Sequence, residues 1–114
     1  GAIDSAGICQ YPEYELEEIS DLLSNACDGD WSAEYLHLVG ERIWNLERQF
    51  NLAAGLTSAD DTLPERMLKE PAPSGAGKDR VCELDKMLPE YYSLRGWDKN
   101  GVPTAKTLSR LSLD

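Results

Sequence analysis

The stretch Tyr35-Leu-His-Leu-Val-Gly-Glu-Arg-Ile-Trp-Asn-Leu-Glu-Arg-Gln-Phe50 decides the fold of this chain. Its apolar residues recur at alternating steps of three and four, which is the repeat of one face of an α-helix. They are Leu36, Val39, Ile43, Leu46 and Phe50. Ser32 is a suitable N-cap, and Gly55 is a suitable left-handed residue after the last turn. We therefore predict a long helix between these two residues, with the apolar stripe in the core.

Other residues of this helix suggest what surrounds it. A glycine inside a helix costs about 1 kcal/mol relative to alanine, so Gly40 indicates that another stretch of backbone lies close. His37, beside the apolar stripe, is interpreted as a partly buried structural side chain. Arg42 and Arg48 are expected on or beside the polar face. There they would form ion pairs with Glu41, Glu47 or the Asp60-Asp61 pair that hold the following loop.

The segments before this helix divide into two parts. Residues 1–13 are expected to be extended or irregular, because their pattern is mixed and Pro12 interrupts it. From Glu13 the apolar residues follow helical spacing as far as Ala26, and Asp28-Gly29-Asp30 ends that helix.

Three short helices are predicted after the long one. Thr62 and Glu65 form a capping-box pattern for a helix over residues 63–69. Asp85 is the expected cap of a helix with Pro89 in its first turn and Gly96 at its end. Thr104 is the expected cap of a last short helix. Residues 70–80, rich in proline and glycine, are predicted to be a mobile loop. The fold class is all-α, with four or five helices in a small orthogonal bundle with an irregular N-terminal segment.

The composition of the chain argues against several classes of partner and metal site. The chain has 114 residues, with 21 acidic and 11 basic side chains and a formal net charge of −10, and we expect a single helical domain over residues 1–114. This acidity argues against nucleic acid and anionic membranes as partners. The three cysteines and one histidine exclude a zinc ribbon and a His-rich metal site. An odd number of widely spaced cysteines favours a reducing, cytoplasmic location. The opening Gly1-Ala2-Ile3 lacks an initiator Met, and we expect it to be cut from something longer.

Four ordered segments carry a resemblance to a known family. They are Gly40-Glu-Arg-Ile-Trp-Asn-Leu-Glu-Arg-Gln-Phe-Asn51, Asp60-Asp-Thr-Leu-Pro-Glu-Arg66, Leu84-Asp-Lys-Met-Leu-Pro-Glu-Tyr-Tyr-Ser-Leu-Arg-Gly-Trp97 and Asp98-Lys-Asn-Gly-Val-Pro-Thr104. In this order and spacing the chain resembles the C-terminal domain of the tungsten-containing aldehyde:ferredoxin oxidoreductases, from Ala2 to Leu113. It is similar to about the last fifth of such an enzyme. The segment Asp4-Ser-Ala-Gly-Ile-Cys9 is similar to the family's D-x-x-G-L-C motif, with Ile8 in place of leucine.

The resemblance implies a function for this motif. It implies that Asp4 hydrogen-bonds the pterin of a tungsten bis-pterin cofactor, and that Cys9 is the fourth ligand of a 4Fe-4S cluster. Asp4, Ile8 and Cys9 are thus the cofactor-binding candidates, Cys9 is the metal ligand, and residues 1–12 form a cofactor-facing loop. The family's other three cluster cysteines lie in a C-x-x-C-x-x-x-C motif that this sequence does not contain. Cys27 and Cys82 have no such role, and we interpret them as buried small apolar side chains.

Two hypotheses follow. In the first, the chain is part of an oxidoreductase that converts aldehydes to carboxylates, with the remaining domains of that enzyme and ferredoxin as partners. No catalytic side chain is assigned, and the isolated chain would be inactive and bind no cofactor. In the second, it is a stand-alone acidic helical interaction module without cofactor.

Overall fold

The computed structural model describes residues 1–9 and 11–114. The helices of this part are α1 (Ala2–Ser5), α2 (Leu16–Ala26), α3 (Ala33–Ala53), the 3-10 helix η1 (Ser58–Asp60), α4 (Glu65–Lys69), α5 (Leu84–Arg95) and α6 (Ala105–Leu111). No strand occurs among the described residues, where β-pairing is limited to two isolated bridges. The all-α prediction is confirmed.

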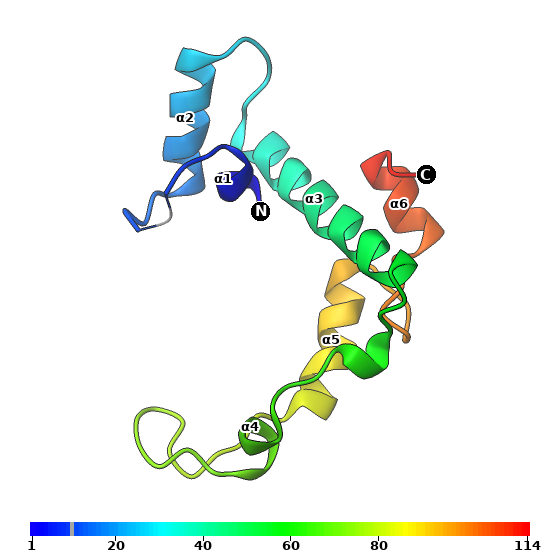
Figure 1. Cartoon of the computed structure of the whole chain (residues 1–114). Coiled ribbons are helices and arrows are strands. Elements are labelled where there is room, and N and C mark those ends of the chain that lie inside the picture. The colour runs from blue at the N-terminus through cyan, green and yellow to red at the C-terminus, as the bar shows by residue number, and fades with distance from the viewer. Residues whose placement is uncertain (10) are drawn as a thin grey trace.

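Helix α3 is the element on which the others assemble (Figure 1). Helices α1 and α2 pack on its N-terminal half, and α6 packs along its side. From the C-terminal end of α3 the chain continues through η1 and α4 into an arm that returns as α5 (Figure 1). The radius of gyration is 17.5 Å, whereas a compact chain of this length has about 13 Å. The molecule is therefore an open arc, and much of its surface faces outward.

Local capping explains where several helices begin and end. The Ser32 hydroxyl accepts a hydrogen bond from the backbone N–H of Tyr35 (3.3 Å), as predicted for the start of α3. The Thr104 hydroxyl does the same for Thr107 at the start of α6 (3.3 Å). Gly96 ends α5 with a φ of 69°, in the left-handed region where glycine is favoured. These three predictions are confirmed.

Two predicted caps are wrong. Pro64 occupies the N-cap position of α4, so Glu65 begins the helix and cannot reach back to Thr62. The capping box of this region is made earlier, by Thr57 and Asp60 around η1. Helix α5 begins one residue before Asp85, which lies in the first turn, and Pro89 lies inside the helix.

The sequence predicted an extended or irregular N-terminal segment. This prediction is wrong for residues 2–5, which form α1. This short helix packs against α3 at Gly40. A β-carbon placed on Gly40 would lie 3.6 Å from both the Cβ and the backbone nitrogen of Ala2. The prediction that another backbone lies close to Gly40 is confirmed.

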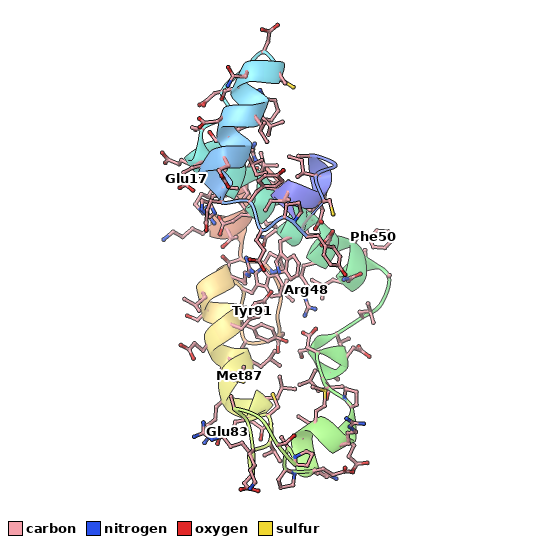
Figure 2. The ribbon with its side chains drawn as sticks, turned by 90° about the vertical axis from the view of Figure 1, so that its left-hand side faces the viewer. Glu17, Arg48, Phe50, Glu83, Met87 and Tyr91 are labelled. Carbon is pink, nitrogen blue, oxygen red and sulfur yellow. The ribbon has the colours of Figure 1, made fainter. Side chains whose placement is uncertain are left out.

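The buried face of α3 differs from the predicted one. Leu36 is buried, but Leu46 is 57% exposed and Phe50 is 74% exposed. The face that Trp97 and the turn before α6 cover instead carries Asn45 and Arg48, and Arg48 is only 7% exposed. The expectation that Arg48 lies on a polar face is therefore wrong, because the segment after α5 packs on that side. Phe50 and Arg48 leave α3 in different directions (Figure 2).

Candidate functional site

The D-x-x-G-x-C segment is shaped by the end of α1. The backbone N–H of Ile8 donates to the Ile3 carbonyl (3.3 Å), and that of Gly7 donates to the Asp4 carbonyl (3.0 Å). Gly7 has a φ of 71°. This pair of bonds is the Schellman motif, which requires a left-handed residue where Gly7 stands. This explains why the D-x-x-G-x-C segment has glycine at position 7, because a left-handed residue there turns the chain sharply between Asp4 and Cys9.

The structure brings the three predicted cofactor contacts together on one short stretch. Asp4 lies on α1 and is exposed, Ile8 is half-buried, and Cys9 is exposed directly after the cap. The Cys9 thiol is in no disulfide. No atom outside the adjacent chain lies within 4 Å of the position where a β-carbon on Gly7 would stand. A carboxylate acceptor and an accessible thiol are therefore both exposed within six residues, with open space at Gly7 between them in the sequence.

A metal held at this segment needs ligands from elsewhere. No group of three or more His, Cys, Asp or Glu side chains that could hold a metal ion occurs within residues 1–9 and 11–114. A thiolate is the usual ligand of iron–sulfur clusters, so Cys9 fits the role of one ligand in a set completed by other residues.

The other sulfur and imidazole groups lie apart from a common site. Cys27 is exposed at the end of α2, and half-buried Cys82 has its sulfur 3.9 Å from that of Met87. The prediction that both are buried is wrong for Cys27, because α2 extends beyond the body of the molecule and leaves its end in solvent (Figure 1). His37 is also exposed rather than partly buried.

A cavity of about 430 Å³ lies beside α1, and sequence analysis did not find it. It is lined by Gly1, Ala2, Ile3, Leu16, Leu36, His37, Gly40, Glu41, Trp44 and Arg95. The guanidinium of Arg95 lies 5.2 Å from the ring centroid of Trp44 and 5.3 Å from that of Tyr91. The Trp44 indole N–H donates to the Tyr91 hydroxyl (2.6 Å). Tyr91 and Arg95 have the helical spacing of four, but nothing in the sequence points to Trp44 as their partner.

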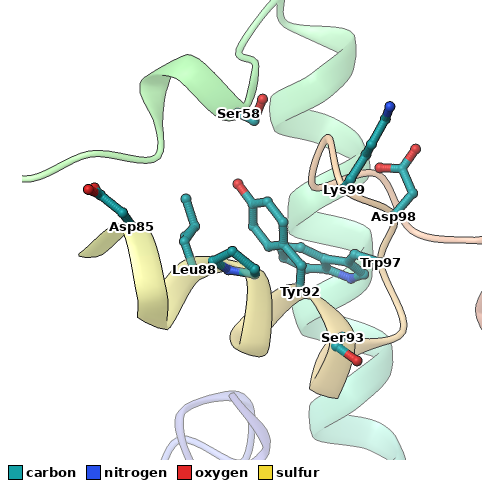
Figure 3. A pocket seen from close by; sticks show the side chains of 9 residues that line it. Ser58, Asp85, Leu88, Tyr92, Ser93, Trp97, Asp98 and Lys99 are labelled. Carbon is teal, nitrogen blue, oxygen red and sulfur yellow. The ribbon is translucent and has the colours of Figure 1, made fainter. Parts of the chain in front are cut away.

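A second cavity, of about 520 Å³, opens between η1 and α5 (Figure 3). Its walls include Leu88, Pro89, Tyr92 and Trp97, with Asp98 and Lys99 at one end. Tyr92 and Trp97 of this cavity also neighbour an ion pair, in which the Arg48 guanidinium donates to both carboxylate oxygens of Asp61, at 2.8 and 2.6 Å. The Tyr92 hydroxyl also donates to Asp61. The prediction that Arg48 pairs with the Asp60-Asp61 pair is confirmed.

These contacts shift the protonation of the groups involved. Burial raises the pKa of Tyr92, and its hydrogen bond to Asp61 and the charge of that carboxylate raise it further, to about 12. Burial also acts to raise the pKa of Asp61, but hydrogen bonds from Arg48 and Tyr92 outweigh it and the pKa is lowered. Asp61 is therefore ionised and Tyr92 neutral at pH 7. The arrangement is a structural ion pair rather than an acid–base catalyst, because neither group titrates near neutrality.

Comparison with known proteins places these features in a family of redox enzymes. Residues 1–113 match the family model described as aldehyde ferredoxin oxidoreductase, domains 2 & 3. The chain belongs to the aldehyde ferredoxin oxidoreductase family.

Particular relatives agree with this assignment. The chain is 46% identical to the tungsten-containing aldehyde ferredoxin oxidoreductase of Pyrococcus furiosus, over 97% of this chain and 19% of that protein. The enzyme of the same name from Thermococcus kodakarensis is 48% identical over 91% of this chain. Among solved structures, the active site complex of benzoyl coenzyme A reductase with 1,5-dienoyl-CoA has a TM-score of 0.76 and 27% identity, covering 97% of this chain and 17% of that one.

The chain spans about a fifth of the length of the curated relatives that it matches. Its own fold contains no helix, among those described, with the length and apolar character needed to span a membrane.

Proposed function

We propose that this chain is part of a longer enzyme that oxidises an aldehyde to a carboxylate and passes two electrons to ferredoxin. Relatives in Pyrococcus and Thermococcus carry the name tungsten-containing aldehyde ferredoxin oxidoreductase and match almost the whole chain. The observation that carries the proposal is the D-x-x-G-x-C segment, which the Schellman cap of α1 folds so that Asp4 and Cys9 are both exposed. The stand-alone module lacks comparable support.

In the proposed enzyme the chain's own residues bind and orient. The carboxylate of Asp4 accepts hydrogen bonds from the N–H groups along the edge of a pterin. The thiolate of Cys9 would bind one iron of a 4Fe-4S cluster, and half-buried Ile8 would supply an apolar contact to the cofactors. Tungsten and pterin supply the two-electron chemistry when bound, and the protein supplies position and electrostatics. Placing both contacts within six residues keeps the cluster and pterin close together.

The remaining ligands come from outside this chain in the proposal. One exposed thiol cannot hold a cluster by itself, and the described residues contain no metal-binding group of three or more side chains. We therefore expect the isolated chain to be inactive.

The test is made in the longer enzyme, with each cysteine replaced separately by serine. Cys9→Ser is expected to lose or convert the cluster and to abolish electron transfer, because serine replaces the thiolate that iron requires. Cys27→Ser is the matched control, since the Cys27 side chain is also exposed. This substitution should change the free energy of unfolding by less than about 0.5 kcal/mol. Iron content and the low-temperature paramagnetic signal of the reduced cluster are measured under anaerobic conditions.

A second variant tests the carboxylate. Asp4→Asn keeps the size of the side chain but removes its charge, so pterin content should fall while the iron content stays near that of the parent. A full 4Fe-4S signal and normal activity in Cys9→Ser would refute the assignment of Cys9 and the core of the proposal.

A further inference from the structure

The outward face of α3 is patterned for burial, but its C-terminal part, at Leu46 and Phe50, is left exposed by the described part of the chain. We call Ile43, Leu46 and Phe50 the outer stripe. Leu46 and Phe50 are more than half exposed, and together with Ile43, Glu47 and Asn51 they line a cavity of about 450 Å³. Large apolar side chains at such regular helical spacing are typical of a face in contact with another element.

The first half of the same stripe shows how such a face is covered. Leu36 continues the stripe toward the N-terminus of α3, and it is buried where α1 and α2 pack on this half of the helix. The stripe is therefore one surface, buried at one end by this chain and exposed at the other. Arg48 and Asn45, on another side of α3, bind Gly101 and Trp97 of the segment after α5, so that segment packs on a different face from the outer stripe.

The position of Gly1 indicates which polypeptide reaches the exposed half. A β-carbon on Gly1 would lie 3.6 Å from the Gly40 carbonyl oxygen and 3.7 Å from Cγ2 of Ile43. Gly1 thus lies at the edge of the outer stripe. In the longer enzyme of the proposed function, the residues that precede Gly1 leave the chain at this face.

Charge argues against a second copy as the occupant. Each chain carries a formal net charge of −10, and Glu47 borders the stripe, so two copies would bring like charges together. A segment of the same polypeptide is already held near the stripe, so its effective concentration there is high and it needs no association of two separate molecules.

We propose that the outer stripe is an interface within one polypeptide, covered by an apolar surface of the part of the longer enzyme that precedes Gly1. This inference rests on the proposed function, because it requires the longer chain. It assigns to α3 two different roles, with one face building this domain and the other joining it to the rest of the enzyme.

Thiol labelling in the longer enzyme tests the interface. Phe50→Cys and Lys106→Cys are made separately, and each is treated anaerobically with a maleimide before and after denaturation in urea. Lys106 is exposed on α6 and serves as the control. The expected result is labelling at position 50 at least tenfold slower than at position 106 in the native enzyme, with equal rates in urea. Mass spectrometry separates the new thiol from the native ones.

A second variant keeps the test valid if Phe50→Cys fails to fold. Glu47→Cys replaces an exposed polar side chain that lines the same cavity, and slow labelling is expected there too. Labelling as fast as at position 106 would overturn the interface. Protection that is lost on dilution would assign the stripe to a second copy and overturn it as well. The cluster signal, recorded on the same samples, reports on the proposed function independently of either result.

Discussion

Arg48 is the residue on which the C-terminal half of the molecule converges. Its Nε donates to the Gly101 carbonyl (2.8 Å), and its guanidinium carbon lies 5.0 Å from the ring centroid of Trp97. With the bidentate pair to Asp61, one side chain ties together α3, the loop after η1, and the turn before α6. Arginine suits this position because its planar fork can meet a carboxylate and a carbonyl at once.

Removing the Tyr92 hydroxyl should weaken this network and change its pH dependence. Tyr92→Phe leaves Asp61 with one hydrogen-bond donor fewer, at a cost of about 1–3 kcal/mol in the free energy of unfolding at pH 7. The pKa of Tyr92 is raised from 10.0 to about 12, so its contribution is complete below pH 10 and is lost as pH rises from 10 to about 12. The variant should lack this alkaline loss.

Urea melts between pH 7 and 12 measure both effects. Tyr11→Phe is the control, because Tyr11 is 95% exposed, and its melts should match those of the parent. If Tyr92→Phe and the parent lost stability in parallel above pH 10, the hydrogen bond to Asp61 would not be the cause.

Gly101 should tolerate no side chain. It has a φ of 71°, and a β-carbon there would lie 2.4 Å from Nη2 of Arg48 and 2.9 Å from Cζ of Tyr92. Gly101→Ala must therefore displace the buried network in addition to straining the backbone, and we expect a loss of about 2–4 kcal/mol. Gly75 also has a positive φ, 81°, but nothing lies within 4 Å of it, so Gly75→Ala should cost only about 1 kcal/mol. Equal costs in denaturant melts would show that the close approach to Arg48 is unimportant.

At the scale of the elements, α1 is held in place by its fit to α3. The helix has four residues, too few to be stable alone, so its position depends on the contact of Ala2 with Gly40. Asp4 and Cys9 flank the cap of this same helix. Their placement therefore depends on a residue of α3 that carries no functional group.

Substitutions at Gly40 should distinguish close contact from open space. Gly40→Ala places its β-carbon at 3.6 Å from Ala2, an ordinary contact, and improved helix propensity should stabilise α3 by up to about 1 kcal/mol. The longer side chain of Gly40→Leu extends beyond this contact toward Ala2 and should displace α1, at a cost of about 1–3 kcal/mol. Amide hydrogen exchange over residues 2–8 checks the displacement. Unchanged protection in Gly40→Leu would contradict the packing of α1 on α3.

Elements whose signals are local could be predicted from the sequence. The starts of α3 and α6 follow from Ser32 and Thr104, and the end of α5 follows from Gly96, because each cap acts within a few residues. The caps at Thr62 and Asp85 failed because neighbouring residues, such as Pro64, offered a competing start. The helical spacing of α3 was predicted correctly, but the prediction that its whole apolar stripe is buried was wrong, because burial depends on segments far away in the sequence.

At the scale of the whole molecule, the candidate site also has a part that the sequence predicted and a part that it did not. The segment from Asp4 to Cys9 stands out in the sequence because its residues are contiguous. The group of Trp44, Tyr91 and Arg95 beside α1 arises only when α3 and α5 meet, so no local pattern could have indicated it. The open shape, with a radius of gyration of 17.5 Å, is also a property of the assembled chain.

The polar centre around Arg48 also bears on how the chain folds. Its hydrogen bonds join residues far apart, with a sequence separation of 52 for Asn45 and Trp97 and of 53 for Arg48 and Gly101. The hydrogen bonds within a helix join residues close in the sequence. Fixing α3 against the turn before α6 instead closes a long loop, and the chain loses conformational entropy before these contacts can stabilise it. The helices should therefore precede the assembly of the C-terminal half. We expect the closure of this long loop to limit the rate at which the C-terminal half assembles, since contacts between distant residues slow folding.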